Sequence, residues 1–296
     1  MNFDFLVATL YFAGWKLVRS LPEKFAYSTF DKLGSITLRR NGTRMQRLRR
    51  NLQRVCPDKD SVAMDELMSK AVSSYMRYWC DTFRSPDWSK DKIFATVSVT
   101  REELLTGPMR DGRGVVVTLP HSGNWDHAGA YFCAMGFPLV TVAEKLKPEA
   151  LFNRFLEYRQ NIGMEVLSTD SKSMGTLMQR ARDGALIALV ADRDLSRSGV
   201  DVNFFGYPAR MPAGAALLAI RTGTPLITAH VSYRATGIHI EFNQVDIPSE
   251  GTDAERVSKI VQRCADLFEA GIAKAPEDWH MLQRIWIDGD FQERTA

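Results

Sequence analysis

The stretch Val115-Val116-Val117-Thr118-Leu119 lies between Gly114 and Pro120 and is followed at once by His121-Ser122-Gly123-Asn124-Trp125-Asp126. A short β-branched and apolar run between turn-forming residues is typical of a strand buried on both faces. Such strands belong to the middle of a parallel sheet, because helices cover both faces of that kind of sheet. The stretch therefore predicts an α/β fold with polar residues gathered where this strand ends.

Similar apolar runs recur along the chain, at 138–143, 164–167, 185–191 and 225–232. Helical patterns lie between the runs, at 126–133, 149–161, 173–183 and 213–221, and a last helix is expected at about 253–273. This alternation predicts a mostly parallel central sheet flanked by helices on both faces. The exception is an antiparallel hairpin predicted about Thr236-Gly237 and formed by 225–234 and 238–245.

The first 90 residues have a different character. Six arginines and no acidic residue stand between Lys32 and Arg54, namely Arg39, Arg40, Arg44, Arg47, Arg49 and Arg50. Met45, Leu48, Leu52 and Val55 recur at helical spacing, whereas Arg47, Arg50 and Arg54 line another face. Such a helix suits an anionic membrane surface, although a solvated helix face is the common alternative. We expect one domain over 1–296, with a helical lead over 1–90 that contacts the membrane and an α/β core over 91–296.

Three further features limit the possible classes of protein. The run from Phe5 to Trp15 is too short to span a bilayer, so it is either a core helix or an interfacial anchor. A net charge of +3 is too small for a nucleic-acid-binding surface. The four cysteines form no short-spaced pair, so we expect reduced thiols in the cytosol and no zinc site.

His121 is the strongest candidate for chemistry. Imidazole exchanges a proton near neutral pH, so it can act as the general base that an attacking alcohol needs. Asp126 could fix the ring tautomer from the other nitrogen, since the H-x4-D spacing folds around one strand-to-helix turn. Ser122 or Asn124 could cap the following helix, whose N–H groups would then stabilise negative charge on a thioester oxygen.

Polar residues also follow the other predicted strands, at Glu144 and at Asp192-Arg193-Asp194. Arginines in the next loop, Arg193, Arg197 and Arg210, could meet the phosphates of coenzyme A or a lipid, or could form surface salt bridges. The glycines at 199, 206 and 214 are interpreted as turns around that loop. His127, His230 and His239 fit structural roles, and His280 is a candidate for lining a pocket.

Several longer motifs resemble the actinobacterial phosphatidylinositol mannoside acyltransferases, a branch of the superfamily that includes the lipid A late acyltransferases. The matching segments are 119–126, 141–149, 192–195 with 198–200, 204–206, 210–214 and 278–283. The likeness runs from about residue 13 to Trp286, which is nearly the whole chain. These motifs are far more specific than H-x4-D alone.

The resemblance implies a monotopic acyltransferase on the cytoplasmic face of the plasma membrane. It would transfer a long acyl chain, typically palmitoyl, from acyl-coenzyme A to the 6-hydroxyl of a mannose on phosphatidylinositol mannosides, without metal or cofactor. By the same resemblance His121 and Asp126 form the catalytic pair and Glu144 lies at the acceptor site. Further residues are expected to bind substrate, namely Asp192, Arg193, Asp194, Arg210 and His280.

Asp192 departs from the pattern, because the mannoside branch carries Glu there and the lipid A branch carries Asp. Since Asp is one methylene shorter, a contact made by Glu is expected to be lost, bridged by water or made by Asp194.

Three other hypotheses remain open from the sequence. The first is a lipid A-type acyltransferase that acts on another glycolipid. The second is a metal-dependent hydrolase that uses Asp126, His127, Asp192 and Asp194 as ligands. The third is a non-enzymatic peripheral membrane protein anchored by its N-terminal helices.

Overall fold

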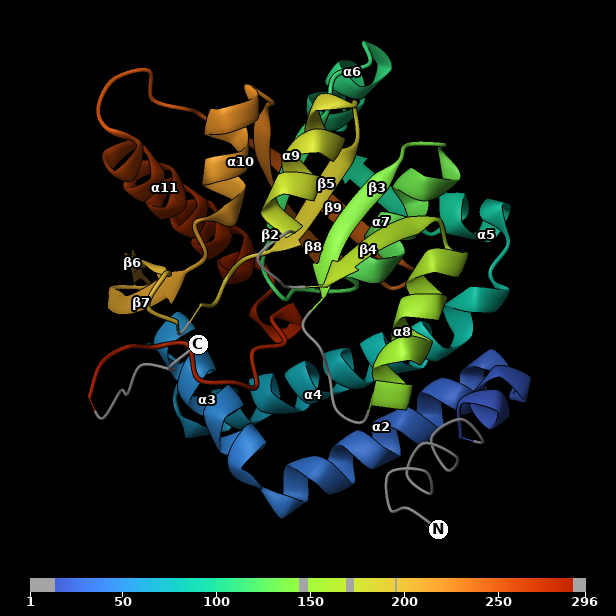
Figure 1. The fold of residues 1–296 in the computed structure, drawn as a ribbon. Coiled ribbons are helices and arrows are strands. Elements are labelled where there is room, and N and C mark those ends of the chain that lie inside the picture. The colour runs from blue at the N-terminus through green and yellow to red at the C-terminus, as the bar shows by residue number, and fades with distance from the viewer. Residues whose placement is uncertain (1–13, 144–148, 169–172, 195, 290–296) are drawn as a thin grey trace.

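The computed structural model describes residues 14–143, 149–168, 173–194 and 196–289. A seven-stranded sheet forms the centre, in the order β1-β9-β8-β2-β5-β3-β4 (Figure 1). All neighbouring strands are parallel except β8 and β9, which pair as an antiparallel hairpin. Their bounds are β1 Val97–Thr100, β2 Val115–Leu119, β3 Leu139–Ala143, β4 Met164–Ser168, β5 Leu186–Val190, β8 Leu226–Tyr233 and β9 Ile238–Val245.

The predicted α/β class and the predicted hairpin are both confirmed. The hairpin turns at Gly237, which has a φ of 80°, and a Cβ there would lie 1.8 Å from the carbonyl oxygen of Thr96. The four-residue strand β1 was not predicted from the sequence. The two-stranded antiparallel sheet of β6 (Val200–Phe204) and β7 (Tyr207–Met211) was not predicted either, since only turns were expected there.

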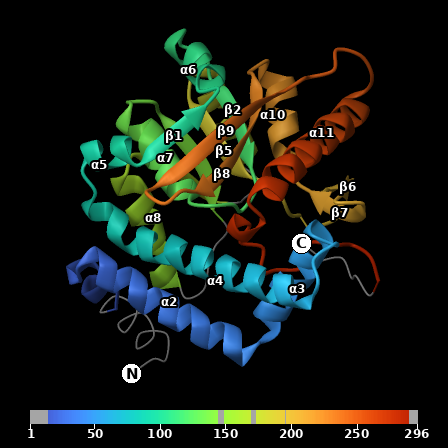
Figure 2. The same cartoon turned by 180° about the vertical axis from the view of Figure 1, so that it is seen from behind.

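Helices cover both faces of the sheet (Figures 1 and 2). α6 (Glu103–Arg110) and α7 (Trp125–Ala134) pack on one face, with α5 (Lys90–Ala95) against α7 and α8 (Glu149–Asn161) beside β4. α9 (Ser173–Arg182), α10 (Gly214–Thr222) and α11 (Asp253–Lys274) pack on the other face. Each face has its own apolar cluster, and the fully buried residues of β2 and β5 contribute to both.

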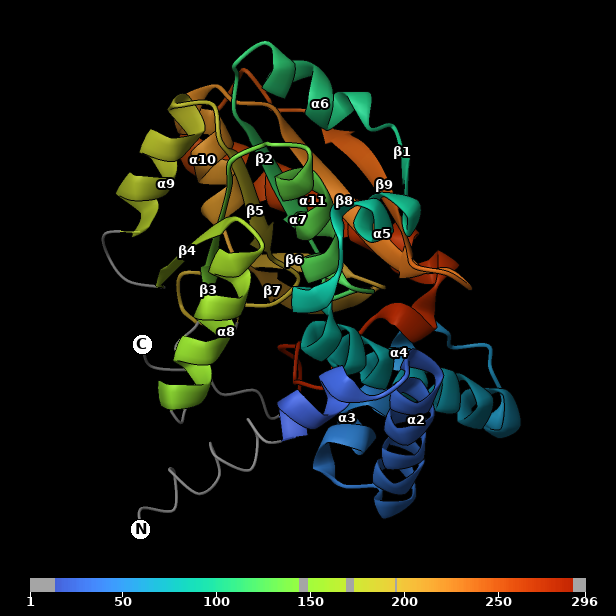
Figure 3. The same cartoon turned by 90° about the vertical axis from the view of Figure 1, so that its right-hand side faces the viewer.

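The N-terminal helices lie across the edge of the sheet where the parallel strands end (Figure 3). They are α2 (Glu23–Arg40), α3 (Thr43–Val55) and α4 (Ser61–Arg84), and helical turns at Ser85–Asp87 and Pro276–Asp278 complete the fold. α4 joins this layer to the core, because Ser74 hydrogen-bonds Asp278 at 2.6 Å and Tyr78 hydrogen-bonds Asp126 at 3.1 Å. No helix in the described part of the chain has both the length and the apolar character that a bilayer span requires.

The arginine-rich helix is α3, and it differs from the prediction at one residue. Its stripe of Met45, Leu48 and Leu52 is buried, and Arg47 and Arg50 are exposed, as predicted; Arg44 is exposed as well. Arg54 instead turns inward: it forms an ion pair with Asp288 at 2.8 Å, and its guanidinium lies over the rings of Tyr207 and Trp286. Arg54 therefore does not belong to the exposed basic face.

The apolar run that ends at Trp15 lies mostly outside the described residues. Trp15 itself is 4% exposed, and its indole nitrogen donates to the carbonyl of Phe83 at 2.9 Å. The end of the run is therefore a buried part of the helical layer.

His230, on β8, is buried with no hydrogen-bond partner for either ring nitrogen within the described residues. Its ring lies against the backbone at Gly271 of α11. Burial lowers the pKa of His230 to about 4, so the imidazole is neutral at pH 7. An apolar side chain of similar size would remove two unsatisfied polar atoms from the core.

We therefore expect His230→Leu to raise the free energy of unfolding at pH 7 by about 1–2 kcal/mol. Because the folded pKa of His230 lies below the unfolded value of 6.5, the unfolded state binds the proton first. Because of this histidine, the free energy of unfolding decreases as the pH falls from 6.5 to 4, by up to about 1.4 kcal/mol per pH unit. Urea unfolding at pH 7 and pH 5 should show a smaller pH dependence in the variant.

His239→Leu is the matched control, because the His239 ring is half-buried and bonds Ser98 and Thr100. It should not stabilise the protein. Equal stability of parent and His230→Leu, with an unchanged pH dependence, would contradict the interpretation.

Candidate active site

His121 lies at the carboxyl end of β2, and its side chain is 37% exposed. Its Nδ1 is 2.6 Å from Oδ1 of Asp192, and its backbone N–H donates to Oδ2 of the same carboxylate at 3.0 Å. Asp192 comes two residues after β5, the strand that pairs with β2 in parallel. Parallel pairing brings the two strand ends together, and with them the imidazole and the carboxylate. Because the carboxylate accepts the Nδ1 proton, the lone pair of the ring is on Nε2.

Asp192 is fully buried, and its Oδ2 also accepts a hydrogen bond from the indole nitrogen of Trp279 at 2.9 Å. Burial alone would raise the pKa of Asp192, but His121 and Trp279 outweigh it and hold the pKa below the usual 3.8. The carboxylate is therefore ionised at neutral pH. It orients the His121 ring and can stabilise the imidazolium form.

The prediction that Asp126 orients His121 is wrong. Asp126 lies in the first turn of α7, and its buried carboxylate accepts hydrogen bonds from Arg159 at 2.9 Å and from Tyr78 at 3.1 Å. Burial alone would lower the pKa of the Arg159 guanidinium, but Asp126 raises it above the usual value. The H-x4-D aspartate therefore forms a buried ion pair between α7 and α8.

The interpretation of Asp192 changes as well. It was expected to contact substrate, but its oxygens are enclosed by His121 and Trp279. The shorter aspartate still reaches the imidazole directly. Asp194 does not replace it, because Oδ1 of Asp194 accepts from the backbone N–H of Ser196 at 2.8 Å in a local turn.

The loop that carries His121 is fixed to its surroundings. Gly123 has a φ of 58°, and a Cβ there would lie 2.5 Å from the carbonyl oxygen of Val231 on β8, so only glycine allows this close approach. Asn124 caps α7 by accepting from the backbone N–H of His127 at 2.9 Å. Ser122, the other candidate cap, donates instead to Val231 at 2.8 Å. The cap holds the N-terminal end of α7 next to the His121 loop.

His280 lies beside this loop, since its backbone N–H donates to the carbonyl of His121 at 2.8 Å. Its ring is buried, and its Nε2 is 2.9 Å from the hydroxyl of Ser74. That hydroxyl donates its only proton to Asp278, so it must accept a proton from Nε2 of His280. Nδ1 of His280 is then a buried acceptor with no partner in the described structure, and burial lowers the pKa of this histidine to about 3.

The other residues predicted to bind substrate lie in the region of the β6–β7 hairpin and the loop before it, or outside the described residues. Arg210 bonds Asp201 at 2.5 Å and the carbonyl of Ser196 at 3.1 Å, so it holds the β6–β7 hairpin to the preceding loop. Arg193 is half-buried directly after Asp192, and Arg197 is exposed. Glu144 lies outside the described residues.

The residues suggested as metal ligands are engaged in other contacts. Asp192 bonds His121, Asp126 bonds Arg159, and the Nε2 of His127 lies 3.1 Å from the hydroxyl of Thr96. Within the described residues no group of three His, Cys, Asp or Glu side chains is arranged to hold a metal ion.

Three residues contribute to this site that were not predicted from the sequence, namely Trp279, Ser74 and Arg159. Trp279 stands in the 278–283 motif, where only His280 was selected. The motif itself was therefore the available signal for Trp279. Ser74 and Arg159 lie on otherwise ordinary helices, and no sequence pattern distinguishes them.

A half-exposed imidazole held by a buried carboxylate is typical of enzymes that use a histidine as general base to activate a nucleophile. Comparison with known proteins identifies the family within that class. The chain belongs to the bacterial lipid A biosynthesis acyltransferase family, whose sequence model matches residues 3–287. It is therefore an acyltransferase.

Similar curated relatives share almost the full length of the chain. A phosphatidylinositol mannoside acyltransferase of Mycolicibacterium smegmatis is 41% identical over 289 residues, covering 97% of this chain and 93% of the relative. A protein of the same name from Mycobacterium tuberculosis H37Rv is 38% identical over 291 residues, covering 97% of this chain and 90% of the relative. The resemblance inferred from the motifs is confirmed.

Proposed function

We propose that this acyltransferase moves a long-chain fatty acyl group, palmitoyl by preference, from acyl-coenzyme A to the 6-hydroxyl of a mannose on phosphatidylinositol mannosides. The relatives that align with 97% of this chain are named for this acceptor, which supports the proposal. The observation that carries the proposal is the pairing of His121 with buried Asp192. It supplies a base for an alcohol, as transfer to a sugar hydroxyl requires.

In the proposed reaction Nε2 of His121 accepts the proton of the mannose hydroxyl as its oxygen attacks the thioester carbonyl. Asp192 stabilises the imidazolium that forms, and the N-terminal end of α7 stabilises the developing oxyanion. Collapse of the tetrahedral intermediate breaks the C–S bond. The departing thiolate of coenzyme A then takes the proton from His121, which returns the imidazole to its neutral form.

His280 fits a role in holding the acceptor sugar. Its backbone N–H donates to the carbonyl of His121, which places residue 280 next to the catalytic loop. Glu144 and Arg193 remain candidates for acceptor and donor contacts, and we propose no role for Asp194 in binding.

The direct test uses purified protein, palmitoyl-coenzyme A and mannosylated phosphatidylinositol in vesicles. We expect free thiol to appear with a product heavier by one palmitoyl group, and fragmentation of the product should place that group on mannose. Parallel reactions replace the acceptor by a lipid A precursor and the donor by acyl-carrier protein. Transfer only to the lipid A precursor would overturn the proposed acceptor.

We also propose that the enzyme is peripheral on the cytoplasmic face of the plasma membrane. Phe25, Leu33 and Ile36 are exposed on α2 at the spacing of one helix face. The neighbouring α3 exposes Arg44, Arg47 and Arg50. An apolar face beside exposed arginines suits an anionic bilayer surface, because both features add to the binding free energy.

Changing Arg44, Arg47 and Arg50 together to glutamine should weaken binding to anionic vesicles roughly a hundredfold, at about 1 kcal/mol for each arginine. Vesicle co-sedimentation at low and high salt measures this. Arg49→Gln is the matched control on the same helix, because Arg49 already pairs with Asp65. Unchanged vesicle binding in the triple variant would rule out α3 as the contact surface.

A further inference from the structure

A cavity lies between α2 and α4, beside the face of α4 that carries Ser73, Arg77 and Asp81. Its volume is about 360 Å³, and its walls come from α2, α4, α5, α7 and the β8–β9 turn. The rim includes exposed Glu23, Asp31 and Ser73, and the floor is formed by buried Asp81 and His127. We call it the α2–α4 cavity.

Helix α4 separates this cavity from the active site. Ser73, Arg77 and Asp81 recur every fourth residue and line the cavity, whereas Ser74 and Tyr78 contact His280 and Asp126. Residues four apart share one face of a helix, so the two sets occupy neighbouring faces. The cavity is thus distinct from the His121 site.

The charged and polar side chains that line the cavity disfavour anionic ligands and acyl chains. Three carboxylates line the cavity against two basic side chains, and both basic groups are engaged by the protein. Lys92 pairs with Glu23 at 2.6 Å, and Arg77 donates to the carbonyls of Arg234 at 2.8 Å and Gly237 at 3.2 Å. An anionic group would therefore meet unfavourable charge, and an acyl chain would meet a polar floor.

The polar groups of the lining are suited to hydroxyl groups. Asp31 accepts one bond from Ser73 at 2.7 Å and retains lone pairs at the exposed rim. The hydroxyl of Thr96 donates to the carbonyl of Lys92, so it accepts from Nε2 of His127. Nδ1 of His127 is then an acceptor, and no residue in the described structure bonds it.

We propose that the α2–α4 cavity binds a neutral polyhydroxylated ring, a sugar or a cyclitol, at a site separate from the catalytic one. Its volume lies near the lower end of the range of about 300–1,000 Å³ for small-molecule pockets, which suits one ring rather than a lipid. Ring hydroxyls donate to Asp31 and His127, and the ring carbons contact the aromatic side chains of Phe30 and Trp88.

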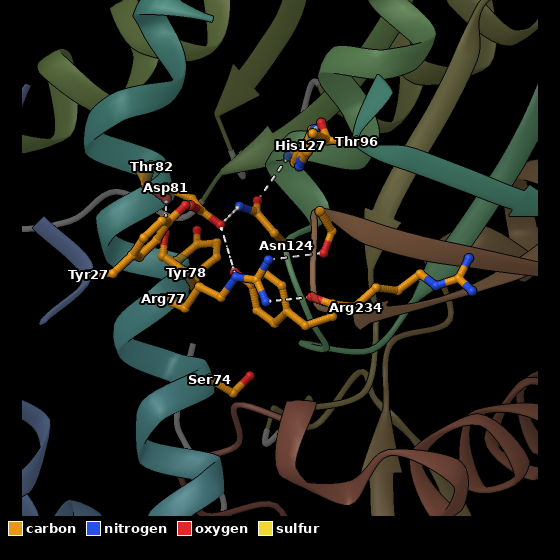
Figure 4. A network of polar contacts seen from close by, with 12 residues as sticks. Tyr27, Ser74, Arg77, Tyr78, Asp81, Thr82, Thr96, Asn124, His127 and Arg234 are labelled. Carbon is orange, nitrogen blue, oxygen red and sulfur yellow. Dashed lines mark hydrogen bonds and ion pairs between the residues drawn. The ribbon is translucent and has the colours of Figure 1, made fainter. Parts of the chain in front are cut away.

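The floor of the cavity is connected to the catalytic loop. Asp81 accepts hydrogen bonds from Tyr27 at 2.5 Å and from Asn124 at 3.4 Å, and Asn124 caps α7. Figure 4 shows Asp81 and Asn124 pointing toward each other, with His127 and Thr96 beyond them. A ring bound on this floor would lie next to Asp81, which accepts a hydrogen bond from Asn124, the residue that caps α7.

The test is saturation-transfer NMR on the full chain, with methyl α-mannoside and myo-inositol as probes and a titration to give dissociation constants. We expect at least one probe to bind. Asp31→Asn, which keeps an acceptor for Ser73 but loses the charge, should weaken binding about tenfold. Ser73→Phe places a ring in the cavity from an exposed helix position and should abolish the binding that depends on Asp31.

Two control variants locate the binding. Glu66→Gln changes an exposed acid on α4 that does not line the cavity, and His121→Ala changes the catalytic site. Both should bind the probe as the parent does. Failure of both probes, dissociation constants that neither Asp31→Asn nor Ser73→Phe changes, or loss of all binding in His121→Ala would each overturn the proposal. None of these results depends on acyl transfer, so the proposed function is tested separately.

Discussion

Replacing His121 with alanine should lower the rate of acyl transfer by ~10²–10⁴-fold, because the reaction loses its general base. The fold should survive the change. Asp192 keeps two donors, the backbone N–H of residue 121 at 3.0 Å and the indole of Trp279 at 2.9 Å. Release of thiol from palmitoyl-coenzyme A under single-turnover conditions is the measurement.

His121→Gln provides the matched variant, since an amide keeps hydrogen-bonding capacity but cannot act as a base near neutral pH. Both variants should unfold at urea concentrations close to that of the parent. Transfer at the parental rate by either folded variant would remove His121 from the mechanism.

Asp192→Asn should reduce transfer by about 10³–10⁴-fold, the size of effect seen when a catalytic histidine is held in the wrong tautomer. The reason lies in the donors around this carboxylate. Trp279 and the backbone of His121 both donate to Oδ2, so they fix the amide oxygen of Asn there. The amide NH₂ then faces Nδ1 of His121, which forces the ring proton onto Nε2 and leaves no base.

Asp126→Asn is the informative comparison, because it changes the aspartate of the H-x4-D motif. Its loss breaks the buried pair with Arg159, for which we expect a loss of about 3–5 kcal/mol in unfolding free energy. Transfer per folded molecule should fall much less than in Asp192→Asn. A stable but inactive Asp126→Asn, together with an active Asp192→Asn, would show that the assignment is reversed. Asp192→Glu, which keeps the charge, should retain more activity than Asp192→Asn.

The sheet could be predicted because its central strands are continuous apolar runs. β2 is buried at every position, and the sequence predicts both of its bounds. β1 and the β6–β7 hairpin were missed for a physical reason. β1 is a four-residue edge strand of intermediate burial, and β6 alternates between buried and exposed residues beside glycines that indicate turns.

The catalytic histidine could be predicted and its partner could not. His121 follows a buried strand, and a residue in that position is expected at the ligand-binding edge of an α/β sheet. Asp126 was chosen as its partner because it is close in sequence. Asp192 is 71 residues away and reaches the ring because β5 pairs with β2, a pairing that the sequence pattern does not specify.

The contacts near His121 join residues that are far apart in the sequence, and this separation should delay their formation during refolding. Trp279 is 87 residues from Asp192, and Asp278 is 204 residues from Ser74, yet each pair is hydrogen-bonded. Contacts at such separations form late, because closing long loops costs entropy before the contacts stabilise the chain. Recovery of enzymatic turnover from denaturant will therefore lag behind recovery of helical circular dichroism, and turnover will report on completion of the native topology.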